Sequence, residues 1–290
     1  SRLMTRMSSA EKNTCLKAMA SAIEENSAEI LKANALDMET GHSMELSEAL
    51  LDRLLLNQNR IAAMAHGLRK VTELEDPVGR VLDERERPSG LKLKKVSCPI
   101  GVIVMIYESR PNVTIDAAGL CLKSGNSVIL RGGSEAISTN RRLMHSIRNS
   151  LKSKNNKQSL DQVQLIEITD RHAVGCLLQM DKFVNVIIPR GGKTLIKRIS
   201  EESKIPVIKH LDGNCHVYID KHADMSKAIN ISVNSKTQRF GVCNAMETLL
   251  VHKDVPKKIL SELVNSFQSQ GVEIRGCKNT KKFFSNIIAA

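Results

Sequence analysis

Residues 100–131 read IGVIVMIYESRPNVTIDAAGLCLKSGNSVILR, and this stretch decides the fold. The run IGVIVMIY at 100–107 is continuously apolar, which is typical of a strand buried on both faces of a parallel sheet. The segment TIDAAGLCLKSG at 114–125 has helical character, and SVILR at 127–131 is the next buried strand. The order strand, helix, strand predicts a parallel βαβ unit.

The same alternation continues after residue 131. A helix is expected over 134–150, and short apolar runs follow at 164–168, 185–189 and 206–211, with helices between them. Strands that alternate with helices predict a doubly wound α/β sheet. Two later runs, GNCHVYID and METLLVH, have the apolar character of further strands.

Helix signals dominate the chain before this sheet. Ser8 and Glu11 form a capping-box pattern ahead of a helix that is expected to end near Glu25. Further helices are expected over 27–39 and 46–72. The first seventy residues therefore predict a helical layer that precedes the sheet.

Residues 78–98 interrupt this helical pattern. The segments VGRVLDERE and LKLKKVSC flank the turn RPSG and carry apolar residues near every second position, which predicts a two-stranded hairpin. A polar ribbon between larger elements often contacts another subunit. We therefore expect the hairpin to act as an oligomerisation arm.

Composition narrows the classes of partner. The 290 residues carry 43 Lys and Arg against 31 Asp and Glu, a formal net charge of +12, which favours an anionic partner. Aromatic residues make up only 2% of the chain, so the exposed rings on which single-stranded nucleic acid stacks are scarce. We expect a small-molecule substrate and no nucleic-acid partner.

No apolar run approaches the roughly 18 residues that a membrane span requires, and the first residues lack the apolar region of a secretory signal. We therefore expect a cytoplasmic protein without a membrane partner. The seven cysteines contain no CxxC pair, which argues against a disulfide framework or a metal site. Most of them are interpreted as buried, reduced thiols.

Two glycine pairs follow predicted strands and precede predicted helices, at 132–133 and 191–192. Backbone N–H groups at such a turn can bind a phosphate at the positive end of a helix. Neither pair matches a Rossmann fingerprint, and Ile187 occupies the position at which a P-loop needs glycine. A plain tight turn is the alternative, but Arg131 and Arg190 beside the pairs favour a phosphate-bearing ligand.

Cys243 is the cysteine with a candidate chemical role. Lys236 and Arg239 precede it closely and favour the thiolate, which is the nucleophilic form. By position alone a buried structural cysteine is the stronger interpretation. Cys215, inside a strand pattern, is interpreted as structural.

Four strings of the sequence carry a family resemblance over essentially the whole chain. They are PIGVIVMIYESRPNVTIDAAGLCLKSGNSVILRGGSEA, VIIPRGGK, GNCHVYID and KTQRFGVCNAMETLLVH. In this order they closely resemble the γ-glutamyl phosphate reductases, also called glutamate-5-semialdehyde dehydrogenases, of the aldehyde dehydrogenase superfamily. The YESRPNVT and CNAMETLLVH strings are highly specific for that family.

The resemblance implies an aldehyde dehydrogenase-like α/β fold. Residues 1–213 are expected to form a Rossmann-like NADP-binding domain with the hairpin arm at about 78–98. Residues 214–290 are expected to form the first part of an α/β catalytic domain. Because the family's chains continue well past the CNAMETLLVH strand, the resemblance also implies a C-terminally truncated chain with an incomplete catalytic domain.

The resemblance carries functional residues onto matching positions of this sequence. The catalytic residues implied are Cys243 as nucleophile and Asn112, which lies near the superfamily's oxyanion asparagine. The residues implied for binding the adenosine side of NADPH and its diphosphate are Arg131, Gly132, Gly133, Ser134, Arg190, Gly191 and Gly192. The candidates for binding the substrate's α-carboxylate are Arg110, Lys236 and Arg239.

The implied reaction is the NADPH-dependent reduction of L-glutamyl 5-phosphate to L-glutamate 5-semialdehyde and phosphate through a cysteinyl thioester. It is the second step of proline biosynthesis from glutamate. Hydrolytic relatives carry Glu in an E-L-G-G segment, whereas this chain has His210 in HLDG, so no base activates water against the thioester.

The implied assembly is a homo-oligomer coupled in function to glutamate 5-kinase, and fusion to that kinase stays open. Two other interpretations also stay open. One is a general aldehyde dehydrogenase, and the other is an NADP-binding or assembly module without turnover.

Overall fold

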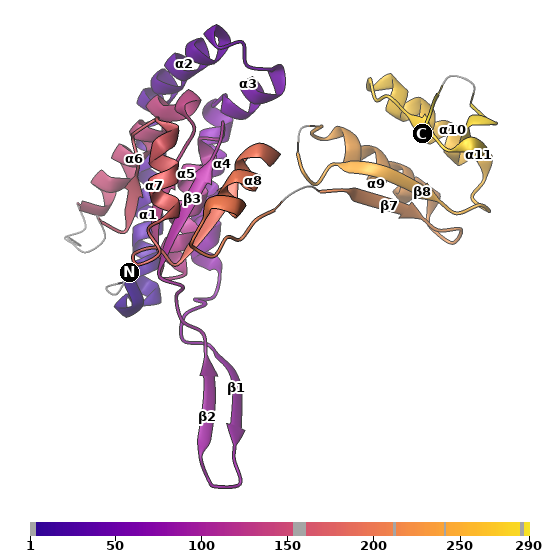
Figure 1. Cartoon of the computed structure of the whole chain (residues 1–290). Helices are drawn as coiled ribbons and strands as arrows, with labels where there is room; N and C mark the ends of the chain where they lie inside the picture. Colours follow the sequence, from indigo (N-terminus) through magenta and orange to yellow (C-terminus); the bar gives the residue numbers. More distant parts are fainter. Residues whose placement is uncertain (1–3, 153–160, 211–212, 241, 285–286) are drawn as a thin grey trace. The chain divides into compact units, whose positions relative to one another are not determined.

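The computed structural model describes residues 4–152, 161–210, 213–240, 242–284 and 287–290 (Figure 1). The chain divides into the compact units Ser1–His210 and Leu211–Ala290.

A parallel sheet lies at the centre of the first unit, with the strand order β5-β4-β3-β6. Its strands are β3 (Val102–Tyr107), β4 (Ser127–Arg131), β5 (Val163–Leu165) and β6 (Val186–Arg190). The strand expected over 206–211 is wrong for residues 206–210, the part that the structure describes, because they make a single bridge, from Val207 to Ile187. Pro206 has no N–H to donate, and Ile208 is 55% exposed beside it.

Helices cover both faces of this sheet, which confirms the predicted doubly wound architecture. Ile103 and Tyr107 of β3 pack on one face, while Val104 and Ile106 pack on the other. This alternation explains why β3 is apolar at successive positions. The helices on the first face are α5 (Asn112–Lys123) and α6 (Ile137–Lys152), and α1 (Ser9–Glu25) and α4 (Gln58–Glu73) pack against them. The helices on the second face are α7 (Arg171–Leu178) and α8 (Lys193–Glu202).

The N-terminal helices follow the sequence signals with one correction. Ser8 caps α1 through the predicted capping box with Glu11. The single helix expected over 46–72 is wrong, because α3 (Glu48–Leu54) ends before α4 begins. The Asn57 side chain accepts a hydrogen bond from the Arg60 N–H, so it caps α4 and starts a new helix. The remaining elements of this region are η1 (Met4–Arg6) and α2 (Ser27–Ser43).

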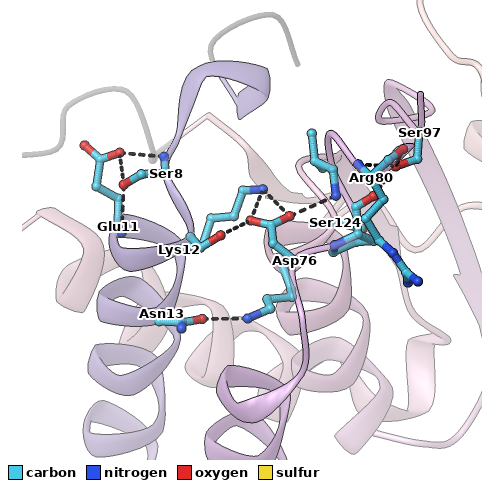
Figure 2. A network of polar contacts seen from close by, with 12 residues as sticks. Ser8, Glu11, Lys12, Asn13, Asp76, Arg80, Ser97 and Ser124 are labelled. Carbon is cyan, nitrogen blue, oxygen red and sulfur yellow. Dashed lines mark hydrogen bonds and ion pairs between the residues drawn. The ribbon is translucent and has the colours of Figure 1, made fainter. Parts of the chain in front are cut away.

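The predicted hairpin is confirmed as β1 (Val81–Glu86) paired antiparallel with β2 (Lys92–Val96), and it projects from the helices and sheet of its own unit (Figure 1). A polar network fixes its base (Figure 2). The buried Lys12 ammonium contacts Asp76 at 2.9 Å, and the Asp76 carboxylate accepts the Val78 N–H at 3.0 Å. The Arg80 N–H, just before β1, donates to Ser97 Oγ, just after β2, at 3.0 Å.

The second unit contains a parallel pair, β7 (Cys215–Ile219) and β8 (Met246–Val251). The helices α9 (Met225–Thr237) and α10 (Lys257–Ser269) contribute to its core, which includes the buried residues Ile219 and Phe267. The elements after α10 are β9 (Arg275–Gly276), α11 (Lys278–Lys281) and β10 (Ile288–Ala289). Among the described residues, no helix combines the length and apolar character that a membrane crossing requires.

Candidate active site

The first glycine turn connects β4 to the short helix η2 (Ser134–Ala136). The Arg131 guanidinium is buried there and donates to Gly132 O at 3.0 Å and to Thr169 O at 2.8 Å. Burial lowers the pKa of Arg131, and the charges of Glu135 and Glu108 oppose that shift. Arg131 therefore links the backbone carbonyls of Gly132 and Thr169. Within the described part of the chain, its Nε has no hydrogen-bond partner.

Gly132 lies against a buried chain of polar groups. Tyr107 Oη and Thr114 Oγ1 are 2.7 Å apart, and Thr114 Oγ1 donates to Asn140 Oδ1 at 2.9 Å. A Cβ at residue 132 would lie 2.3 Å from Asn140 Nδ2. A side chain at residue 132 would therefore displace Asn140 from this buried chain of polar groups.

The second glycine turn already binds an anionic group. Gly192 is the N-cap of α8, and its N–H donates to Glu108 Oε2 at 2.9 Å. A Cβ at residue 191 would lie 2.7 Å from the same carboxylate, so the absence of a side chain at Gly191 makes room for Glu108. Because the N-terminal end of a helix favours negative charge, the turn is suited to a phosphate oxygen.

Ser109 follows Glu108, which contacts the second glycine turn, and itself contacts Glu135 beside the first glycine turn. It is a buried non-glycine residue with φ of 42°, a conformation that L-residues seldom adopt. Its N–H donates to Glu135 Oε1 at 2.6 Å, and its Oγ donates to the same oxygen at 2.8 Å. The loops after β3 and β4 are thereby joined at the carboxyl edge of the sheet.

Sequence reasoning missed Glu108, Ser109 and Glu135. They stand in the quoted strings YESRPNVT and RGGSEA, directly after strands or glycine turns. The carboxyl ends of parallel strands meet at one edge of a sheet, where ligands bind in open α/β folds. Their position after β3 and β4 was the signal that could have identified them.

Two predicted catalytic or substrate residues follow β3, one in the loop and one at the start of α5. Asn112 is the first residue of α5, is half-buried, and donates to Asp116 Oδ2 at 2.9 Å. Arg110 is half-buried two positions earlier. Both belong to the unit that contains the two glycine turns.

The remaining predicted residues belong to the second unit. Lys236 is a half-buried residue of α9, and Arg239 is exposed just after that helix. Cys243 is exposed, so the interpretation of Cys243 as a buried structural thiol is wrong. It lies in the segment that connects α9 to β8, outside the regular packing of both elements.

The backbone of Cys243 contacts the start of the preceding strand. The Cys215 thiol donates to Cys243 O at 3.5 Å. A Cβ at residue 213 would lie 2.0 Å from the same oxygen, so only glycine fits at Gly213. His210 of the HLDG segment is exposed, and residues 211–212 lie outside the described part of the chain.

The expectation that most cysteines are buried is wrong, because loops and element ends place several of them at the surface. All seven cysteines lie within the described residues and are unpaired. The buried ones are Cys15 and Cys121, Cys215 is half-buried, and the exposed ones are Cys98, Cys176, Cys243 and Cys277. Among the described residues, no group of three or more His, Cys, Asp or Glu side chains could hold a metal ion.

Comparison with known proteins identifies similar chains. Residues 1–278 match the model of the aldehyde dehydrogenase family. The crystal structure of γ-glutamyl phosphate reductase from Thermotoga maritima is 40% identical, with a TM-score of 0.88, and the match covers 100% of this chain and 69% of that chain. For γ-glutamyl phosphate reductase from Saccharomyces cerevisiae, the identity is 34%, the TM-score is 0.67, and the coverage is 97% and 70%.

A more distant structure agrees on the fold alone. The acetylating aldehyde dehydrogenase from Geobacillus thermoglucosidasius is 18% identical, with a TM-score of 0.63, and the match covers 97% of this chain and 57% of that chain.

Proposed function

The chain belongs to the aldehyde dehydrogenase family and, within it, to the γ-glutamyl phosphate reductases, and we propose that it reduces L-glutamyl 5-phosphate to L-glutamate 5-semialdehyde. The observation that carries the proposal is the similarity of the whole chain to the Thermotoga maritima reductase at 40% identity. The exposed Cys243 supports it, because an acyl-phosphate reductase of this kind needs an accessible thiol.

The first unit is the proposed cofactor domain. In our proposal the adenosine side of NADPH is held by Arg131, Gly132, Gly133 and Ser134, and its diphosphate by Arg190, Gly191 and Gly192. The donor set fits this group, since the Gly192 N–H at the start of α8 already binds a carboxylate oxygen of Glu108. When bound, NADPH supplies the hydride that reduces an acyl group.

The second unit carries the proposed nucleophile. The Cys243 thiolate attacks the acyl-phosphate carbonyl carbon, the bond to the phosphate oxygen breaks, and inorganic phosphate leaves a thioester on Cys243. We propose the Cys243 N–H as a donor to the oxyanion, and we assign the same role to the Asn112 side-chain amide from the family resemblance alone. One such donor is typically worth about 10²–10³ in rate.

The substrate carries a negatively charged α-carboxylate, which cationic side chains bind. Arg110, Lys236 and Arg239 are the proposed partners of its α-carboxylate. Phosphate is a good leaving group, so the reaction needs no strong general acid. His210 occupies the place of the glutamate that activates water in hydrolytic relatives, which preserves the thioester for reduction.

The proposal also covers assembly and supply of the substrate. Leu82, Leu91 and Leu93 of the hairpin are 57%, 58% and 40% exposed, and we propose that a second copy covers them in a homo-oligomer.

An acyl phosphate of glutamate must come from a kinase acting on the side-chain carboxylate, so coupling to a glutamate 5-kinase is part of the proposal.

A trapping experiment tests the thioester. The chain is mixed with glutamate semialdehyde and NADP⁺ without phosphate, quenched in acid, and digested with trypsin. We expect the glutamyl mass on the peptide 240–253, which contains Cys243, and its loss when phosphate is added before the quench. An acyl group on any other peptide would contradict the assignment of Cys243.

A further inference from the structure

Cys215 is a second thiol next to the proposed nucleophile, and the reaction proposed above does not use it. Cys215 is the first residue of β7 and pairs with Met246, the first residue of β8. Cys243 stands three positions before that strand. The Cys215 thiol donates to the carbonyl oxygen of Cys243 itself at 3.5 Å.

This contact places the two sulfur atoms within reach of each other. A carbonyl oxygen lies about 2.4 Å from the Cα of its own residue, so Cys215 Sγ is within about 6 Å of the Cα that bears the Cys243 thiol. Gly213 keeps the two segments this close, because any side chain there would collide with Cys243 O. A disulfide between them requires a side-chain rotation and a small backbone shift, and the Cys243 segment, which lies outside helices and strands, is free of the regular hydrogen bonds that would oppose such a shift.

We propose that Cys215 and Cys243 are a disulfide-forming pair, in which Cys215 is the resolving thiol for oxidised Cys243. The exposed Cys243 thiolate attacks a hydroperoxide, the O–O bond breaks, and Cys243 becomes a sulfenic acid. The Cys215 thiolate then attacks that sulfur, the S–O bond breaks, and water leaves. In total two thiols lose two electrons and two protons, and with hydrogen peroxide as the oxidant two waters form.

The environments of the two thiols suit these roles. Cys243 is exposed and therefore accessible to a small oxidant, whereas Cys215 is half-buried and its thiol donates to Cys243 O. A resolving thiol next to the oxidised one prevents further oxidation to the sulfinic acid, which is not reversed by thiols. The pair therefore protects Cys243 and makes its inactivation reversible.

Peptide mapping tests the pair without any assay of activity. The 290-residue chain is treated with hydrogen peroxide or with diamide, alkylated, and digested with trypsin without reductant. We expect a linked pair of the peptides 210–221 and 240–253, which contain Cys215 and Cys243, and its release by dithiothreitol. Absence of this pair with both oxidants would overturn the proposal.

Two variants serve as controls. In Cys215→Ser we expect no linked pair, and peroxide should instead leave sulfinic acid on the peptide 240–253. Cys277→Ser is the matched control, because Cys277 is exposed in the same unit and its pKa is lowered by hydrogen bonds from Thr280 and nearby backbone. We expect it to form the same linked pair as the unaltered chain, and loss of the pair there would contradict the assignment.

The effect on catalysis rests on the proposed function and is measured separately. If Cys243 is the nucleophile, activity falls in proportion to the linked fraction and dithiothreitol restores it. A linked pair that forms without loss of activity would keep the disulfide and reject Cys243 as the nucleophile. The failure of one proposal is thus distinguishable from the failure of the other.

Discussion

At the residue scale, Glu108 occupies the position that we assign to the cofactor diphosphate. Its carboxylate accepts the Gly192 N–H at 2.9 Å and packs where a side chain at Gly191 would otherwise lie. A cofactor phosphate that binds the Gly192 N–H must either displace the Glu108 carboxylate or lie close to its negative charge. Glu108 is therefore expected to weaken the binding of NADPH.

We predict that Glu108→Gln binds NADPH about fivefold more tightly, since a charge at a helix terminus is worth about 1 kcal/mol. Fluorescence titration of NADPH measures the dissociation constant. Glu202→Gln at the other end of α8 is the control and should leave it unchanged. An equal or weaker affinity of Glu108→Gln would remove Glu108 from the diphosphate site.

Gly213 supports Cys243 through close backbone contact. A Cβ at residue 213 would meet Cys243 O at 2.0 Å, so Gly213→Ala must shift Cys243, the proposed nucleophile. We expect at least a tenfold loss of turnover, because small displacements of reacting groups cost about 10²-fold. Steady-state rates measure it.

Gly67→Ala is the matched control for Gly213→Ala, since nothing lies within 4 Å of the Cβ that it would add inside α4. It should keep the rate and raise stability by about 0.5–1 kcal/mol in thermal unfolding. Full activity of Gly213→Ala would show that the contact with Cys243 is dispensable.

The sequence predicts those residues of the candidate site whose type is distinctive. It does not predict contacts that depend on how the chain folds. The glycine pairs and Cys243 stand out by type and position, and the structure places them at helix starts and on an exposed segment. Whether Arg131 faces outward or bonds Thr169 O depends on the packing of distant segments. Sequence alone does not contain that information.

At the element scale, the ion pair of Lys12 and Asp76 joins α1 to the base of the hairpin (Figure 2). Burial opposes ionisation of Asp76, but hydrogen bonds from Ser9, Lys12 and Val78 outweigh it and lower the pKa of Asp76. A lowered pKa in the folded state stabilises the fold above the unfolded pKa, near about 3.9. This stabilisation is lost as pH falls through the folded pKa.

We predict that Asp76→Asn lowers the free energy of unfolding by about 3 kcal/mol at neutral pH, because the buried Lys12 loses its counter-ion. The difference should shrink as the pH falls below about 4. Urea unfolding at several pH values measures it. Glu24→Gln, which breaks an exposed pair with Arg69, is the control and should cost less than about 1 kcal/mol. A difference that does not depend on pH would contradict the ion pair's role.

Element types were predictable from periodicity, whereas some boundaries were not. The continuous apolar run of β3 and the capping box of α1 are local signals, and both are confirmed. The break before α4 depends on whether Asn57 caps a helix or continues one. Apolar spacing continues across that break, so it conceals the cap.

At the scale of the whole molecule, the hairpin is the proposed oligomer contact. Leu91 and Leu93 are exposed on it, and an isolated two-stranded ribbon gains little stability alone. We predict that the unaltered chain is a homo-oligomer and that Leu91→Lys with Leu93→Lys reduces its mass in light scattering.

The control for this prediction is Lys92→Ser, which changes the hairpin between the two leucines without adding charge. It should retain the oligomer. An unchanged mass for the double lysine variant would show that the hairpin does not hold the copies together.

The reverse reaction shows whether phosphate-dependent chemistry takes place at Cys243. The chain is supplied with glutamate semialdehyde, NADP⁺ and phosphate, and NADPH absorbance is followed beside Cys243→Ala. We predict reduction of NADP⁺ that requires phosphate and is abolished in Cys243→Ala, while that variant still binds NADPH. Reduction that proceeds equally without phosphate would exclude phosphate release from a thioester, and reduction that survives in Cys243→Ala would exclude Cys243 as the nucleophile.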